Sequence, residues 1–272
     1  MYTDARIQYP LDEMSNLLIP VTIGCSYNKC IFCNMYKGEE YAQVPFSDIE
    51  AQLINGYKYT ERLFLVGAEP LSIGFEKMKQ LLDMIHEYLP YCAIVSSYAS
   101  IKNIANYTLE ELSILHDAGL RQLYIGFESG SDEALKYMNK GHTVNEAIKQ
   151  AQRLNEAKIG FNSIIMYGIA GKNKGIENAI ATANMLNQFK SNKIITMSLQ
   201  VFDDTKLGEM LNEGKFIPAD REERIAEIKT LIEHLELTGN TVFDTTHPTN
   251  IIKLMAILPE DKHKLLTMLK NS

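Results

Sequence analysis

Residues 24–33 read Gly-Cys-Ser-Tyr-Asn-Lys-Cys-Ile-Phe-Cys and place three of the chain's four cysteines, Cys25, Cys30 and Cys33, within nine residues. Thiolates are soft ligands that suit iron-sulfur clusters, zinc or copper(I). A structural zinc ion takes four protein ligands. No His, Asp or fourth Cys lies within five residues of this stretch, and Cys92 is in a separate apolar segment. Three thiolates suit a four-iron cluster with one iron open to a small ligand. We interpret the stretch as an iron-sulfur site, with zinc or structural thiols as the alternative.

The composition is that of an ordinary globular chain. Its 272 residues are 46% hydrophobic and 22% charged, which is enough for one large α/β barrel or two small domains. The apolar runs are too short to span a bilayer, and the first residues lack the features of a signal peptide. We therefore expect a cytoplasmic protein with no membrane partner. The formal net charge of −7 offers no overall attraction to nucleic acid.

Six apolar, β-branched segments alternate with helical patterns. They start about 30 to 45 residues apart, which predicts βαβ units with a parallel sheet. The predicted strands are 17–24, 62–68, 93–99, 122–128, 161–168 and 194–201. Cys25 follows the first strand directly. Because active sites of α/β barrels lie at the carboxyl ends of the strands, the cysteine loop is predicted at the mouth of a barrel.

Capping motifs predict where the helices begin and end. The predicted capping boxes are Ser47 with Glu50, Thr108 with Glu111, and Thr143 with Glu146; the predicted helix ends are Gly119 and Gly160. After residue 201 the βα alternation stops. Asp220 is predicted to cap a helix that ends at Gly239, and a last helix is predicted from Pro259. We expect residues 1–204 to form the barrel with an N-terminal lead-in, and 205–272 to form a helical C-terminal extension packed on it.

The cysteine stretch, with Phe32 before its last cysteine, resembles the radical SAM superfamily, in which S-adenosylmethionine (SAM) occupies the open iron of a [4Fe-4S] cluster. The commonest spacing in that superfamily is C-x3-C-x2-C, whereas this chain has C-x4-C-x2-C. The resemblance implies that Cys25, Cys30 and Cys33 bind the cluster and that Phe32 is a neighbour of the SAM adenine. It also implies a partial (β/α)6 barrel and an electron donor such as flavodoxin or ferredoxin.

A second stretch, Gly67-Ala68-Glu69-Pro70, ends the second predicted strand. It resembles the superfamily's Gly-Gly-Glu motif, which holds the amino group of SAM, except that Ala68 replaces the second glycine. Small residues let backbone carbonyls approach a cationic ligand, and the Glu69 carboxylate would add a charge-assisted hydrogen bond. The alternative is an ordinary turn with a solvated Glu69.

The fourth predicted strand ends in Glu128-Ser129-Gly130-Ser131-Asp132, and Lys140-Gly141-His142-Thr143 follows. These two stretches resemble the branch of the radical SAM superfamily that includes tRNA methylthiotransferases and coproporphyrinogen dehydrogenase-like proteins. The resemblance assigns the SAM ribose to Glu128, beside Ser129, since a carboxylate can accept from both hydroxyls of a diol. We predict that Lys140 meets the SAM carboxylate, and the resemblance assigns packing against adenine to the end of the fifth strand, which includes Gly168. A helix cap at Glu128 and a solvated Lys140 are the alternatives.

With the resemblance, these residues predict an enzyme that cleaves SAM reductively and generates a 5′-deoxyadenosyl radical. No residue acting after hydrogen abstraction is assigned. We expect a small-molecule or peptide substrate, because residues 205–272 carry nine Lys or Arg against eleven Asp or Glu and the sequence has no second cysteine cluster. The alternatives are an RNA-modifying radical SAM enzyme and a non-catalytic iron-sulfur redox or sensor protein.

Overall fold

The structure is a computed structural model that describes residues 8–269, and the chain divides into two compact units. The first unit comprises the residues up to Asn28 together with Met35–Ile125 and Arg153–Gly160. The second comprises Lys29–Asn34, Gly126–Gln152 and the residues from Phe161 onward. The division therefore falls within strand β6 (Leu120–Glu128), whose last three residues belong to the second unit.

The main sheet has eight strands in the order β1-β4-β5-β6-β7-β8-β9-β10. The strands pair parallel from β1 through β4 and β5 to β6, and again from β7 through β8 to β9, whereas β9 and β10 pair antiparallel. A parallel sheet requires crossover connections, and helices supply them here. The predicted α/β class is confirmed, and the mainly parallel sheet is consistent with a partial barrel.

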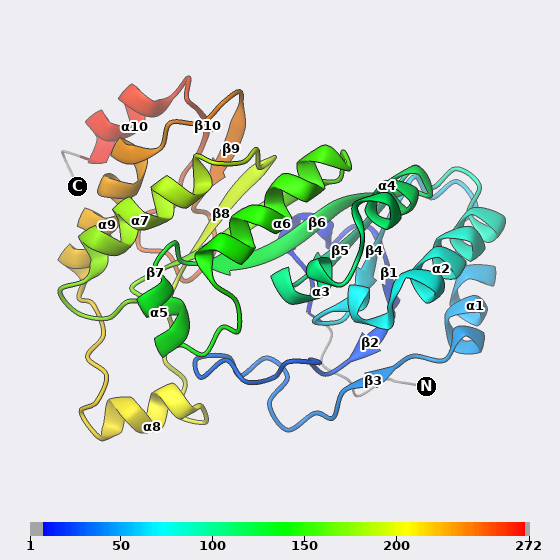
Figure 1. Ribbon diagram of the computed structural model, residues 1–272, viewed down its shortest axis with the longest axis horizontal. Coiled ribbons are helices and arrows are strands. Elements are labelled where there is room, and N and C mark those ends of the chain that lie inside the picture. Colours follow the sequence, from blue (N-terminus) through cyan, green and yellow to red (C-terminus); the bar gives the residue numbers. More distant parts are fainter. Residues whose placement is uncertain (1–7, 270–272) are drawn as a thin grey trace. The chain divides into compact units, whose positions relative to one another are not determined.

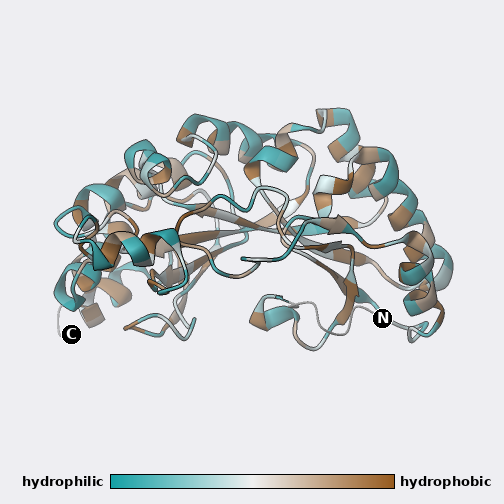
Figure 2. Ribbon diagram, turned by 90° about the horizontal axis from the view of Figure 1, so that it is seen from below, coloured by the Kyte–Doolittle hydropathy of each residue, from teal (hydrophilic) through white to brown (hydrophobic). Residues whose placement is uncertain are grey.

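The first unit contains three complete strands of this sheet, the start of β6, and the helices that connect them. The strands are β1 (Leu17–Pro20), β4 (Arg62–Val66) and β5 (Ile94–Ala99), and a separate antiparallel pair is β2 (Thr22–Ile23) with β3 (Ala42–Gln43). The helices are α1 (Phe46–Ile54), α2 (Phe75–Tyr88), α3 (Ile101–Ala105) and α4 (Leu109–Asp117), with short 3-10 turns η1 (Leu11–Glu13) and η2 (Pro70–Ile73). Helices α1, α2 and α4 lie on one side of these strands (Figure 1). Figure 2 shows their apolar residues turned toward the strands and their polar residues turned away, as expected for amphipathic helices that cover a sheet.

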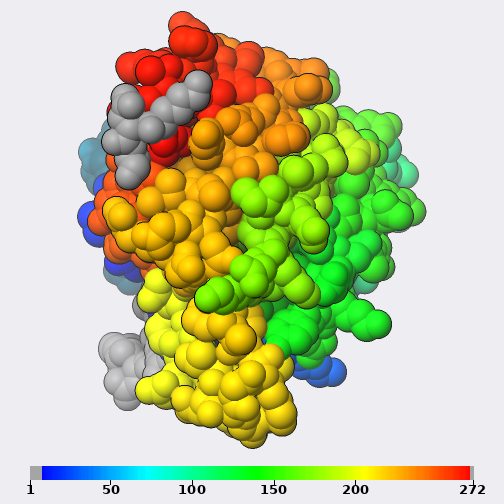
Figure 3. Space-filling view, turned by 90° about the vertical axis from the view of Figure 1, so that its left-hand side faces the viewer, coloured from blue at the N-terminus to red at the C-terminus, as the bar shows by residue number. Residues whose placement is uncertain are grey.

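The second unit contains the end of β6 and the elements that follow it. These are α5 (Asp132–Tyr137), α6 (Val144–Glu156), β7 (Gly160–Tyr167), α7 (Gly175–Leu186), β8 (Lys193–Ser198), α8 (Lys206–Asn212), α9 (Arg221–His234), β9 (Thr241–Asp244), β10 (Met255–Leu258) and α10 (Lys262–Leu269). The unit boundaries fall near the end of α6 and at the start of β7. Helix α9 packs along α7. Figure 3 shows a face of the molecule on which α8 appears in yellow, α9 in orange and α10 in red.

All six predicted strands are present, as β1 and β4 to β8. The first is shorter than predicted. It ends at Pro20, and residues 22–23 turn to pair with Ala42–Gln43 instead. Residues 205–269 also contain β9 and β10, which the sequence analysis did not predict and which extend the sheet.

Two of the three predicted capping boxes are confirmed. Thr108 and Glu111 cap each other's backbone N–H at the start of α4, and Thr143 and Glu146 do the same before α6. The box at Ser47 is wrong. Helix α1 already begins at Phe46, because Pro45 supplies a preset φ of −56° at the cap, so Ser47 lies inside the first turn.

Candidate cofactor site

The first cysteine, Cys25, belongs to the first unit and follows the short strand β2. Gly24, before it, has φ of 66°, and a Cβ there would lie 2.8 Å from the carbonyl oxygen of Glu40, so only glycine fits. The backbone N–H of Asn28 donates to Cys25 Sγ at 3.3 Å. Hydrogen bonds to cluster sulfurs stabilise the thiolate form and tune the cluster. The local structure around Cys25 therefore suits a thiolate ligand.

Cys30 and Cys33 belong to the second unit, in the segment Lys29–Asn34. The N–H of Cys33 donates to the carbonyl of Cys30 at 3.3 Å, which closes a turn. Neighbouring elements fix this turn through its backbone. The N–H of Ile31 donates to the carbonyl oxygen of Met138. The N–H of Leu207, at the start of α8, donates to the carbonyl oxygen of Ile31. Both cysteines are half-buried and pack against an apolar cluster.

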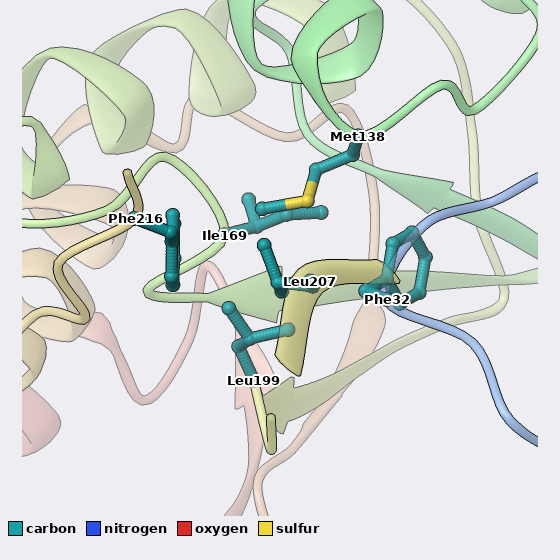
Figure 4. Packing of buried hydrophobic residues seen from close by; sticks show 6 residues of the cluster. All are labelled: Phe32, Met138, Ile169, Leu199, Leu207 and Phe216. Atoms are coloured by element: carbon teal, nitrogen blue, oxygen red, sulfur yellow. The ribbon is translucent and has the colours of Figure 1, made fainter. Parts of the chain in front are cut away.

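Phe32 is one of the buried members of that cluster. The residue is 9% exposed, and the other buried members follow α5, β7 and β8 or belong to α8 and the segment after it (Figure 4). The buried members of this cluster are Phe32, Met138, Ile169, Leu199, Leu207 and Phe216. The aromatic residue between the cysteines therefore anchors their turn to the fold, and its contact with adenine stays a prediction.

Glu128 and Lys140, both in the second unit, form an ion pair in which Glu128 is buried and Lys140 is half-buried. Lys140 Nζ donates to Glu128 Oε1 at 2.8 Å, while Glu128 Oε2 is buried and has no hydrogen-bond partner among the described residues. Glu128 also has φ of 63°, a conformation that is strained for a residue other than glycine. Burial lowers the pKa of Lys140, but the negative charges of Glu128, Cys30 and Cys33 outweigh it and raise this pKa above its usual range. Lys140 is thus a fixed cation beside both the carboxylate and two of the thiolates.

The predicted Gly67-Ala68-Glu69-Pro70 turn is present in the first unit, at the end of β4. Gly67 has φ of 137°, and a Cβ there would lie 2.1 Å from Thr22 Oγ1, so this position requires glycine. Ala68 is half-buried and Glu69 is 6% exposed. Ser26 Oγ donates to Glu69 Oε2, which links the residue after Cys25 to this strand end. The turn is not the ordinary one with a solvated Glu69; the role of Gly67, Ala68 and Glu69 toward SAM stays a prediction.

At the end of β7, Gly168 has φ of 75°, and its N–H donates to Glu227 Oε2 at 2.7 Å. Ser129 Oγ donates to Asn178 Oδ1 at 2.5 Å, so its hydroxyl faces helix α7. The sequence analysis did not identify Asn178 or Glu227. Each is a polar residue on the buried face of a helix, and this is their only local signal. Each contacts partners about 50 positions away in the chain.

In the second unit, the Cys30 and Cys33 side chains beside the Lys140 cation fit an iron-sulfur cluster, and the Glu128 oxygen without a partner among the described residues fits a ligand that donates hydrogen bonds. Within residues 8–269, no three His, Cys, Asp or Glu side chains come together as a ready metal site. The assignment of Cys25, Cys30 and Cys33 as cluster ligands therefore rests on their sequence pattern. Together with the strand-end acids, it predicts a protein that binds its cofactors at the carboxyl ends of parallel strands.

A family model described as the Radical SAM superfamily matches residues 19–183. The chain belongs to the radical SAM superfamily. Membership implies a [4Fe-4S] cluster and SAM as cofactors, and members are generally enzymes that need an electron donor and a substrate. Over residues 8–269, no helix is long and apolar enough to cross a membrane.

Two curated relatives illustrate the range of functions in the superfamily. The heme chaperone HemW of Bacillus subtilis is 26% identical over 250 residues, which cover 89% of this chain and 62% of that protein. A tRNA-2-methylthio-N(6)-dimethylallyladenosine synthase of Hahella chejuensis is 25% identical over 195 residues, which cover 67% of this chain and 43% of that protein. The chain spans less than two thirds of the length of either relative.

Solved structures confirm the fold. Methylornithine synthase (PylB) is similar with a TM-score of 0.57 at 14% identity, covering 94% of this chain and 81% of that one. Coproporphyrinogen III oxidase (HemN) from Escherichia coli is similar with a TM-score of 0.58 at 12% identity, covering 80% of this chain and 51% of that one. At these identities the likeness shows the fold alone.

Proposed function

We propose that this chain is a cytoplasmic radical SAM enzyme that acts on a small-molecule or peptide substrate. When bound, the reduced cluster and SAM supply a 5′-deoxyadenosyl radical that abstracts hydrogen from the substrate. Cys25, Cys30 and Cys33 hold the cluster, and a small electron carrier such as flavodoxin or ferredoxin reduces it. The protein's own contribution is to bind and orient these groups and to keep water away from them.

The observation that carries the proposal is the free oxygen of Glu128. An unsatisfied buried acceptor costs roughly 1–3 kcal/mol, so a fold that retains one gains by receiving a donor from a ligand. Lys140 holds the opposite oxygen, which fixes the carboxylate in place. The ribose of SAM presents two hydroxyl donors, and a carboxylate anchored at one oxygen can accept from them at the other.

The remaining groups have roles that follow from their contacts. The charge of Lys140 stabilises the thiolates of Cys30 and Cys33 and remains available to the carboxylate of SAM. Glu69, 6% exposed at its strand end, supplies a negative charge for the amino group of SAM. Gly168 offers close approach to a planar ring, because it has no side chain.

Charge and similarity support a small-molecule or peptide substrate. The chain has a formal net charge of −7, and residues 205–272 are slightly acidic, whereas nucleic-acid binding relies on dense cationic contacts to phosphates. HemW, similar over 89% of this chain, is named for a small molecule, whereas a tRNA-modifying relative is similar over 85%. The tRNA-modifying relatives keep RNA as the second candidate.

The test is anaerobic reconstitution with iron and sulfide, followed by incubation with SAM and a strong reductant. Formation of 5′-deoxyadenosine, measured by mass spectrometry and absent without reductant, is the expected result. The Cys30→Ala variant is the matched control and should form none. A reconstituted cluster whose spectrum does not change with SAM, and which yields no 5′-deoxyadenosine, would support the non-catalytic iron-sulfur alternative instead.

A further inference from the structure

A chain of buried polar groups in the second unit links the ends of β6 and β7 through helices α7 and α9. Ser129 Oγ, after β6, donates to Asn178 Oδ1 at 2.5 Å, and Asn178 Nδ2 donates to Glu227 Oε1 at 2.8 Å. Gly168 N, after β7, donates to Glu227 Oε2 at 2.7 Å. Ser129, Asn178 and Glu227 are 0%, 4% and 1% exposed. The carboxylate of Glu227 is therefore the point at which two strand ends are tied together.

The hydrogen bonds in this network have a fixed direction. Ser129 Oγ accepts from the N–H of Ser131 at 2.9 Å and gives its own hydrogen to Asn178. Asn178 must then turn its oxygen to Ser129 and its NH₂ to Glu227. Glu227 thus receives a donor at each of its two oxygens, and an ionised carboxylate accepts both bonds most strongly. An amide in its place would turn its NH₂ toward Asn178 or Gly168, and a protonated acid would have an O–H on one of the two oxygens and accept more weakly there.

We infer that Glu227 is a positioning residue whose ionised carboxylate holds the ends of β6 and β7, and with them Glu128 and Gly168, in the arrangement that binds SAM. This inference rests on the proposed function. The hydrogen bonds of Glu227 go to Asn178 on α7 and to the N–H of Gly168. Its effect on SAM binding therefore passes through the two strand ends.

The electrostatics of the site make this role sensitive to pH. Burial raises the pKa of Glu227 to about 7, although its hydrogen bonds with Asn178 and Gly168 and the charge of Arg224 oppose the rise. The other charged or titratable neighbours are Glu223 on α9 and the Tyr167 phenol on β7, whose own pKa burial raises. The carboxylate form should dominate above about pH 7, and the protonated form, with one strand end released, should dominate below it.

The experiment measures SAM binding to the anaerobically reconstituted protein by equilibrium dialysis at pH 6 and pH 8. If only the form with an ionised Glu227 binds SAM, the affinity of the wild-type protein for SAM should be about tenfold weaker at pH 6 than at pH 8. Glu227→Gln should bind weakly at both pH values, near the wild-type value at pH 6. Glu222→Gln makes the same change at an exposed position of α9 and should behave as wild type.

Two further measurements separate positioning from a loss of folding. In the SAM-free protein at pH 8, hydrogen exchange of the peptide containing Gly168 should be faster in Glu227→Gln than in Glu222→Gln, while circular dichroism stays unchanged. Asn178→Asp places a second carboxylate against Glu227 and should move the pH midpoint of SAM binding upward.

The outcomes distinguish this inference from the proposed function. SAM binding by Glu227→Gln with wild-type affinity and an unchanged pH profile would overturn the inference and leave the proposed function standing. No SAM binding by the wild-type protein at either pH would overturn the proposed function, and the inference with it.

Discussion

Lys140 Nζ donates a 2.8 Å hydrogen bond to Glu128 Oε1, and the other oxygen of the same carboxylate is buried without a partner among the described residues. In this pair Oε1 of Glu128 already accepts a hydrogen bond, and Oε2 can accept one from a ligand. We expect Glu128→Gln to weaken SAM binding by roughly ten- to hundredfold, because a hydrogen bond to a charged group contributes roughly 1.5–3 kcal/mol. Equilibrium dialysis with the reconstituted protein measures this.

The control is Glu133→Gln, the same substitution at an exposed glutamate that pairs with Lys174. Both variants should retain full iron content, since neither residue is a thiolate ligand. Unchanged SAM affinity in Glu128→Gln would mean that this carboxylate has only a structural role.

The second prediction concerns the number of clusters. Cys25→Ala, Cys30→Ala and Cys33→Ala should each abolish the [4Fe-4S] cluster, whereas Cys92→Ala should retain it. Burial raises the pKa of the Cys92 thiol, which keeps it protonated and unsuited as a ligand. Iron and sulfide analysis should give about four irons per wild-type chain. Iron near eight, or cluster loss in Cys92→Ala, would contradict the assignment.

The third prediction concerns the reduction potential of the cluster. Lys140 lies close enough to Cys30 and Cys33 for their charges to raise its pKa, so its own charge must in turn stabilise the more negative, reduced cluster. Lys140→Met should lower the potential by roughly 60 mV, the shift that corresponds to a tenfold change for one electron. A redox titration followed by electron paramagnetic resonance, without SAM, measures it.

Lys174→Met removes an exposed lysine and serves as the control, with no expected shift. A potential that stays the same in Lys140→Met would show that the lysine acts on Glu128 alone.

The sequence predicted the six strands and the helix caps at Thr108, Thr143 and Asp220, because each of these depends on residues close together in the chain. It did not predict β9 and β10. These strands are only four residues long, and β10 alternates exposed and buried residues in a pattern too short to distinguish from a loop. It also expected Gly160 to end α6. The structure instead uses Lys158, with φ of 62°, a conformation that favours glycine and gave no signal in a lysine.

The site shows the same limit. Glu69, Glu128 and Lys140 could be predicted as site residues because they follow strands or motifs. Asn178 and Glu227 act on residues about 50 positions away, and that distance is closed only by the packing of α7 against α9. Local patterns describe which face of a helix is apolar, and they give no information on the partner of a buried polar residue.

The fourth prediction concerns stability. The folded state raises the pKa of Glu227 from 4.5 to about 7, so it binds the proton more tightly than the unfolded state does. The resulting stabilisation is fully present below about pH 4.5 and is lost as the pH rises through about 7, a change of roughly 3 kcal/mol. The free energy of unfolding of Glu227→Gln minus that of wild type should therefore increase between pH 5 and pH 8.

Urea unfolding of the cluster-free proteins at the two pH values measures this difference. Glu222→Gln should show no such gain. A free energy of unfolding that changes with pH equally in wild type and Glu227→Gln would mean that Glu227 is ionised throughout this range, and that the pH dependence has another source.

The last prediction concerns the substrate class. An RNA-modifying enzyme must bind tRNA through many contacts to phosphate, and such binding weakens steeply with added salt. This chain has 27 Lys or Arg against 34 Asp or Glu, and its residues 205–272 are also slightly acidic. We therefore expect electrophoretic titration with bulk tRNA at about physiological salt to show binding no tighter than the nonspecific range, roughly 10⁻⁴ to 10⁻⁶ M. Nanomolar, salt-sensitive binding would reject the small-molecule or peptide substrate in favour of RNA, whereas weak binding together with 5′-deoxyadenosine formation would direct the substrate search to small molecules and peptides.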